Sequence, residues 1–207
     1  MQRPGQHLIR VPLLELRPTQ LTVGLAEVRL KREHWAQLKP KERKKLLDSH
    51  WFPAVRGPGG KHYIVDHHHL GLALHEEGVT EVWVTSLADL SELQGETFWR
   101  VMEFHRWAHP FDQRGERRDY SRIPDQVSEL RDDPYRSLAG FVREAGGYAK
   151  DEEPYTEFLW ADYFRARIPV RNLAGKGEPL AAAALARAVE LARSPEARYL
   201  PGWHGQT

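Results

Sequence analysis

The sequence predicts a fold of the α/β (α+β) class, with a mixed half over residues 1–90 and a mostly α-helical half over residues 91–207. In the first half, short segments with alternating apolar residues take turns with segments of helical periodicity. In the second half, apolar residues recur only at helical spacing, and many of them are aromatic. Because this aromatic content exceeds what one small bundle need bury, we expect the helical half to pack against the mixed half.

Four strands and three helices are expected in residues 1–90. Alternating apolar and β-branched residues predict strands over 8–16, 52–55, 62–65 and 81–86. Apolar residues spaced three and four apart predict helices over 25–38, 40–47 and 67–77. The glycine-rich segment 56–61 is expected to connect two strands as a hairpin, because it lacks the Lys-Ser/Thr ending and the following helix of a P-loop.

Four helices are expected in residues 91–207. They cover 97–107, 134–145, 155–167 and 179–193. Asp133 precedes Pro134, and this order suits a capping residue followed by a proline in the first helical turn. Asp162 and Arg165 are three residues apart on one predicted helix, so we expect these two side chains to pair.

The composition is that of an ordinary soluble globular protein, with 29% charged and 41% hydrophobic residues. No apolar run approaches the roughly 20 residues of a membrane span, and the first residues lack the apolar stretch of a signal peptide. We therefore expect a cytoplasmic protein without membrane contact. The absence of cysteine excludes disulfides and thiolate catalysis. A net charge of +1 does not by itself indicate nucleic-acid binding, for which the basic segments 39–45 and 114–118 are local candidates.

Residues 64–70, Ile-Val-Asp-His-His-His-Leu, carry the strongest functional signal. They predict a strand that leads directly into a helix, with the Asp66 carboxylate as N-cap accepting from the N–H of His68 or His69. The start of a helix favours an anion such as phosphate, because backbone N–H groups and the helix dipole point there. A capped helix with one core histidine and two surface histidines would explain the same residues.

The imidazoles and carboxylates of this region could also carry chemistry, since imidazole can act as a base, a metal ligand or a phosphate donor. The candidate catalytic residues are Asp66, His68 and His69. The candidate ligands of a divalent ion (Mg²⁺, Mn²⁺ or Zn²⁺) are Asp66, His68, His109 and Asp112. Residues 109–112 fit equally well a plain turn in which Asp112 caps the following segment.

Residues 63–84 resemble, position for position, the strand, phosphate-binding turn, helix and next strand of the ParB/sulfiredoxin superfamily. Residues 16–20, Leu-Arg-Pro-Thr-Gln, resemble the start of the first motif of that superfamily. The resemblance implies a ParB/sulfiredoxin-like domain over residues 1–90. It also implies that Thr19, Gln20 and His67 contact a phosphate group.

The chain departs from this superfamily at three positions. Leu70 stands where ParB proteins and the related free serine kinases have a phosphate-pairing arginine. Arg56, Lys61 or an arginine of the helical half, such as Arg136, would have to supply the charge. His67 replaces the glycine of the tight turn, and Gln20 occupies the position of the kinase base. In the second half, residues 107–112, 132–140 and 157–162 resemble the branch labelled ParB-like nucleases.

Three functions are compatible with these residues. The preferred one is a phosphodiesterase, nuclease or nucleotide-hydrolysing enzyme that acts at the turn 66–69, assisted by a metal ion. The second is a non-catalytic nucleotide- or DNA-binding module of the ParB type. The third is a small-molecule kinase, which Gln20 and Leu70 disfavour. In the first two cases the expected partner is a nucleotide or a nucleic acid.

Overall fold

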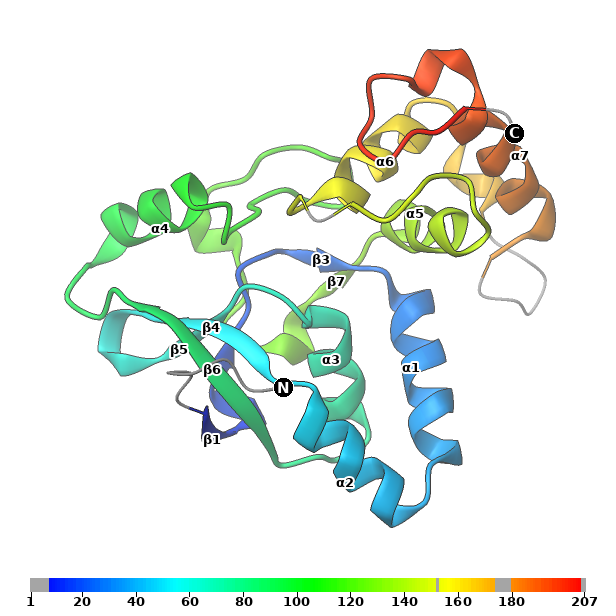
Figure 1. The fold of residues 1–207 in the computed structure, drawn as a ribbon. Helices are drawn as coiled ribbons and strands as arrows, with labels where there is room; N and C mark the ends of the chain where they lie inside the picture. The colour runs from blue at the N-terminus through cyan, green and yellow to red at the C-terminus, as the bar shows by residue number, and fades with distance from the viewer. Residues whose placement is uncertain (1–7, 152, 174–179, 206–207) are drawn as a thin grey trace. The chain divides into compact units, whose positions relative to one another are not determined.

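The computed structural model describes residues 8–151, 153–173 and 180–205 of the 207-residue chain (Figure 1). The chain divides into two compact units. The first comprises the residues up to Thr22, Val28–Asp112 and Arg117–Arg131, and the second comprises Val23–Glu27, Gln113–Glu116 and the residues from Asp132 onward. Helix α4 (Gly95–Phe104) lies in the first unit, whereas the division based on sequence assigned these residues to the helical half.

A five-stranded sheet forms the centre of the first unit (Figure 1). In spatial order its strands are β1 (Leu8–Pro12), β6 (Glu81–Asp89), β4 (Phe52–Arg56), β5 (His62–Ile64) and β2 (Leu16–Arg17). β1 runs antiparallel to β6, and β6 runs parallel to β4. β4 and β5 form the antiparallel hairpin that the sequence predicts, and β2 runs parallel to β5.

The strand predicted over residues 8–16 is wrong as a single element. A 3-10 turn, Leu13–Glu15, separates β1 from β2. The break has a topological cause, because β1 and β2 lie at opposite edges of the sheet and the chain must leave one edge to reach the other. The Leu13 N–H donates to the Thr80 carbonyl oxygen (2.9 Å), and the Leu13 side chain is buried. A backbone hydrogen bond and a buried side chain thus both stabilise the turn.

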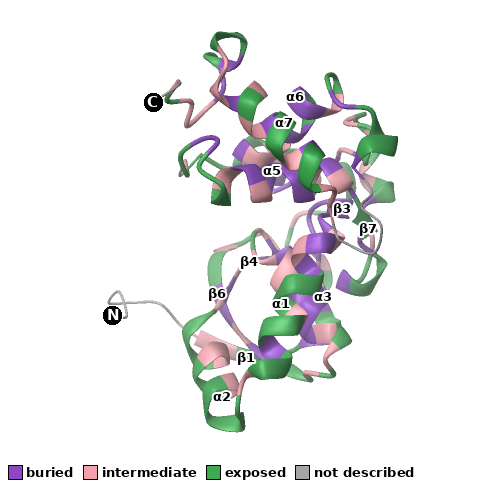
Figure 2. Cartoon of the chain, turned by 90° about the vertical axis from the view of Figure 1, so that its right-hand side faces the viewer, coloured by how far each residue is buried: buried purple, intermediate pink, exposed green. Residues whose placement is uncertain are grey.

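The three helices expected in this part of the chain are confirmed as α1 (Leu25–Gln37), α2 (Pro40–Ser49) and α3 (His68–Glu76). Figure 2 shows α3 as largely buried, whereas no residue of α2 is buried. α3 packs closely on β4, and a side-chain carbon added at Gly71 would lie 3.3 Å from the Phe52 ring. This packing fixes the start of α3 relative to the sheet.

The second unit contains α5 (Pro134–Glu144), α6 (Thr156–Arg165) and α7 (Ala182–Arg193). Asp133 caps α5 as predicted, since its carboxylate accepts from the Tyr135 N–H (3.0 Å). The aromatic segment expected to be buried forms the core of this unit, with Trp160 and Phe164 at 0% exposure. The predicted start of the last helix, Pro179, lies outside the described residues.

The remaining regular elements are short. They are the two-stranded sheet of β3 (Thr22–Val23) and β7 (Arg131–Asp132) and 3-10 turns at Pro58–Gly60, Tyr120–Arg122, Val127–Glu129, Val170–Asn172 and Pro195–Ala197. Within the described residues, the helices are too short and too polar for any of them to cross a membrane.

Candidate functional site

The carboxyl ends of β2 and β5 meet at one edge of the sheet. The two strands are parallel, with Leu16 paired to His62 and Arg17 to Tyr63. The loop after β2 (residues 18–21) therefore lies beside the turn after β5 (residues 65–67), which leads into α3. Crevices at the carboxyl ends of parallel strands are the usual ligand sites of such sheets. The sequence motif that carries the three histidines is thus in a position suited to binding.

His67, and not Asp66, is the residue that precedes α3. His67 has a left-handed backbone (φ 65°, ψ 20°), and its side chain makes no capping hydrogen bond. The predicted cap is therefore wrong. The Asp66 carboxylate accepts from the His67 N–H (2.6 Å), because the turn at His67 delays the helix by one residue. This backbone conformation is one that glycine adopts readily and other residues adopt rarely, so a glycine at this position would fit the same turn.

His68 is buried (4% exposed) and fixes the neighbouring loop. Its Nε2 atom accepts from the Thr19 N–H (3.1 Å), and the Thr19 hydroxyl donates to the Ile64 carbonyl oxygen (2.8 Å). A nitrogen that accepts a hydrogen bond carries no proton, so the neutral ring is protonated on Nδ1. His68 therefore joins loop 18–21 to the first turn of α3, and its Nε2 atom is already engaged.

Thr19 and Gln20 shape this loop through bonds to the backbone. Both side chains are buried, and the Gln20 amide donates to the Thr22 carbonyl oxygen (2.7 Å). His109 continues the same region, because its N–H donates to the Thr19 carbonyl oxygen (2.8 Å) and its backbone forms a parallel bridge with Gln20. The His109 ring stacks on Phe111 with centroids 4.6 Å apart.

Basic groups from two other helices gather around His67. Its ring stands edge-on to the rings of His50 and Phe52, with centroids 6.4 and 5.8 Å away. Burial lowers the pKa of His67, the nearby His50 and Lys31 lower it further, and Asp66 opposes them. Sequence reasoning missed Lys31 and His50, because only the packing of α1 and α2 in the first unit brings them to this turn.

Arg56 and Lys61, predicted to contact phosphate, lie at the other end of the hairpin. Arg56 is paired in register with His62, and its guanidinium bonds to the Asp89 carboxylate (3.3 Å). His62 is the first residue of β5, whereas Asp66 follows the other end of that strand, with three residues between them. The structure therefore does not bring these two cations to the turn at His67.

The candidate metal ligands do not converge on one point. The Asp112 carboxylate pairs with the Arg118 guanidinium (2.6 Å), while the Nε2 atom of His68 accepts from Thr19. In the part of the chain that the structure describes, no group of three or more His, Cys, Asp or Glu side chains could hold a metal ion. The four predicted ligands thus do not form a common metal site in the described residues.

Two predictions of plain structural roles in the second unit are confirmed. Asp162 pairs with Arg165 on α6. Asp133 caps α5, and the Asp132 carboxylate accepts from the Leu25 N–H at the start of α1 (2.9 Å). These carboxylates therefore stabilise helix ends and ion pairs.

Comparisons with known proteins give one family and one similar solved structure. The model of the family described as "Putative ParB-like nuclease" matches residues 9–166. The crystal structure of protein Atu1540 from Agrobacterium tumefaciens is similar to this one, with a TM-score of 0.90 and 44% sequence identity, over 99% of this chain and 100% of that chain. No curated protein matches the chain. Since the family model covers most of the chain, including the turn at His67, the protein belongs to the ParB-like nuclease family.

Proposed function

We propose that the protein binds a phosphate group of a nucleotide or nucleic acid at the turn formed by residues 66–69 and loop 18–21. The observation that carries this proposal is the hydrogen bond from the Thr19 N–H to His68 Nε2, which holds the loop against the first turn of α3. A loop fixed in this way needs no ordering when a ligand arrives, so less conformational entropy is lost on binding.

The electrostatics of the turn support an anionic ligand. The first helical hydrogen bond of α3 runs from the Gly71 N–H to the His67 carbonyl oxygen (2.8 Å), so the positive end of the helix dipole lies at residues 66–69. Lys31 and His50 both act to lower the pKa of His67, and the Lys31 ammonium adds positive charge near the turn. Lys31 thus supplies the positive charge that Arg56 and Lys61, at the loop end of the hairpin, do not.

Replacement of His68 by alanine is expected to weaken binding of ATP or a single-stranded oligonucleotide by about tenfold or more, because loop 18–21 loses its anchor. The same change should lower the free energy of unfolding by about 1–3 kcal/mol, since the buried Thr19 N–H loses its acceptor. Binding is measured by isothermal titration calorimetry and stability by urea unfolding.

Two variants separate positioning from folding. His75→Ala removes a histidine near the end of the same helix and should leave binding unchanged. His68→Gln keeps a carbonyl oxygen that can accept from Thr19, so it should regain part of the lost affinity. The proposal fails if wild-type protein binds neither ligand, or if His68→Ala binds as tightly as wild type.

A second function, phosphodiester hydrolysis at the same turn, is favoured by the placement of Asp66. Its side chain is exposed, and one carboxylate oxygen accepts from the His67 N–H, which holds the group beside the residue that precedes α3. A carboxylate held there could take a proton from the water that attacks a bound phosphodiester. The intermediate exposure of His69 leaves it as a second candidate for this proton transfer.

Asp66→Asn is expected to reduce cleavage of a fluorogenic oligonucleotide by about a hundredfold or more while binding changes little, because the amide cannot accept the proton. The assay is run with EDTA and with added Mg²⁺, Mn²⁺ or Zn²⁺, so that a requirement for a divalent ion becomes visible. Equal cleavage by wild type and Asp66→Asn would reject this role. Binding without cleavage under every condition would leave the binding function alone.

A further inference from the structure

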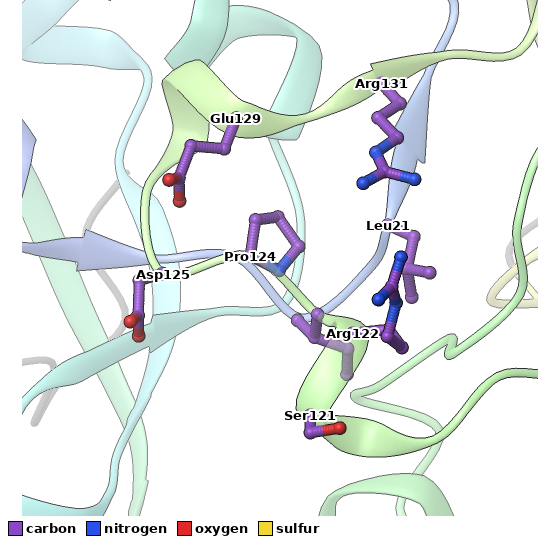
Figure 3. A pocket seen from close by; sticks show the side chains of 8 residues that line it. Leu21, Ser121, Arg122, Pro124, Asp125, Glu129 and Arg131 are labelled. Carbon is purple, nitrogen blue, oxygen red and sulfur yellow. The ribbon is translucent and has the colours of Figure 1, made fainter.

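A polar pocket lies in the first unit, with Leu21 of loop 18–21 in its lining. It has a volume of about 330 Å³ and is bounded by Leu21 and by parts of residues 121–131 (Figure 3). Its frame is rigid, because the Asp119 carboxylate accepts from the Ser121 N–H (2.8 Å) and the Arg131 N–H donates to the Leu21 carbonyl oxygen (3.1 Å). The volume falls at the lower end of the range of small-molecule sites.

Two arginines face each other in this pocket. Arg122 comes from the 3-10 turn Tyr120–Arg122 and Arg131 from β7, and Figure 3 shows their guanidinium groups pointing toward one another. Among the described residues, neither guanidinium has an ion pair or a side-chain hydrogen bond. Two like charges that converge in this way repel each other, and an anion between them would remove that repulsion.

The two acids of the pocket are engaged elsewhere. Asp125 pairs with Arg17 (Nη1 to Oδ1, 3.1 Å), and the Glu129 carboxylate accepts from the Gln126 N–H (3.0 Å). Figure 3 shows both carboxylates on the side of the pocket opposite the two guanidinium groups. The arginines therefore keep their donors for a ligand.

We propose that this pocket binds a phosphate monoester of a small molecule, with its phosphate between Arg122 and Arg131. Guanidinium forks match phosphate oxygens two at a time, and a phosphate dianion offers enough oxygens for both forks. The buried side chains of Leu21 and Ile123 form an apolar base that can contact the carbon portion of the ligand. The pocket shares Leu21 with loop 18–21, but the two arginines that hold the phosphate lie outside the site proposed above, so binding here does not depend on that function.

The test uses the full-length protein and phenyl phosphate, which joins a phosphate dianion to a small apolar ring. Calorimetry should show binding to wild type, and inorganic phosphate should bind more weakly because it lacks the ring. The double variant Arg122→Gln/Arg131→Gln is expected to lose about tenfold or more in affinity, because both charge-assisted contacts are gone. In NMR spectra of wild type, the side-chain Nε–Hε signals of Arg122 and Arg131 should shift on titration.

Arg100→Gln is the matched control, since it removes one arginine charge from exposed helix α4 and should leave the affinity unchanged. The proposal is overturned if phenyl phosphate does not bind, if the double variant binds it as tightly as wild type, or if only an oligonucleotide binds through these arginines. Oligonucleotide binding that survives in the double variant belongs to the turn at His67, so failure of one site is distinguishable from failure of the other.

Discussion

Replacement of Arg165 by alanine is expected to lower the free energy of unfolding by about 3–5 kcal/mol, because it leaves a buried carboxylate without its partner. Arg165 Nη2 lies 2.6 Å from Asp133 Oδ2, and the Asp133 side chain is 1% exposed. The same guanidinium contacts Asp162 and donates to the Gln113 carbonyl oxygen (3.2 Å). One side chain thus joins the start of α5 to α6 within the second unit.

The loss should depend on pH. Burial raises the pKa of Asp133 from 3.8 to about 6, although the charge of Arg165 acts to lower it. Without Arg165 the pKa rises further. A carboxyl group whose pKa is higher in the folded state than in the unfolded state binds its proton more tightly when the protein is folded. Its ionised form therefore destabilises the fold most at pH values above the folded-state pKa. The destabilisation shrinks as the pH falls toward 3.8. The deficit of Arg165→Ala should therefore be smaller at pH 5 than at pH 7.5.

Urea unfolding followed by circular dichroism at both pH values measures this deficit. Arg187→Ala is the control, because Arg187 forms an exposed pair with Glu190 on α7 and should cost less than about 1 kcal/mol. Adding Asp133→Asn to Arg165→Ala removes the buried charge and should restore part of the stability. A deficit that is equal at the two pH values would contradict the assignment of the loss to the charge on Asp133.

Most helices and strands could be predicted from sequence because their causes are local. The hairpin of β4 and β5 follows from two β-rich segments around a glycine-rich connection, and Asp133 followed by Pro134 marks the start of α5. The break in the strand predicted over 8–16 is different. It arises because β1 and β2 occupy opposite edges of the sheet, and no local pattern encodes that placement.

The candidate site was located by sequence, but its internal arrangement was not. A left-handed backbone is rare for a non-glycine residue, so the pattern favoured Asp66 over His67 as the residue that begins the helix. The sequence signal that could have predicted this turn was the glycine that resembling proteins have at the position of His67. His68 was expected to be catalytic. Its hydrogen bond to Thr19 could not be predicted, because it depends on β2 pairing with β5, which is a feature of the tertiary structure.

The positive charge at the site also depends on tertiary placement. Arg56 and Lys61 lie close to His67 in sequence but at the far end of the hairpin in space. Lys31 and His50 lie on α1 and at the end of α2, in segments without a motif, and reach His67 through helix packing. The sequence also did not predict that Arg122 and Arg131 line one pocket, because an arginine in a charged loop is indistinguishable by pattern from a solvated surface residue.

Trp160→Ala is expected to cost about 3–5 kcal/mol, because it empties the centre of the second unit. Trp160 is fully buried, stacks on Tyr148 with ring centroids 4.3 Å apart, and lies beside Phe164. Its indole Nε1–H donates to the Pro201 carbonyl oxygen (2.9 Å), so the substitution also leaves that acceptor without a donor. Thermal and urea unfolding followed by near-ultraviolet circular dichroism measure the loss.

Two variants on the same helix separate the contributions to this loss. Leu159→Ala changes the neighbouring residue, which is 50% exposed, and should cost far less because much of that side chain stays in water in the folded state. Trp160→Phe keeps an aromatic ring against Tyr148 but removes the donor to Pro201, so its cost should fall between those of Leu159→Ala and Trp160→Ala. A buried tryptophan stabilises this unit because it fills the space between α5, α6 and α7. If Trp160→Ala were no more destabilising than Leu159→Ala, Trp160 could not be the centre of this core.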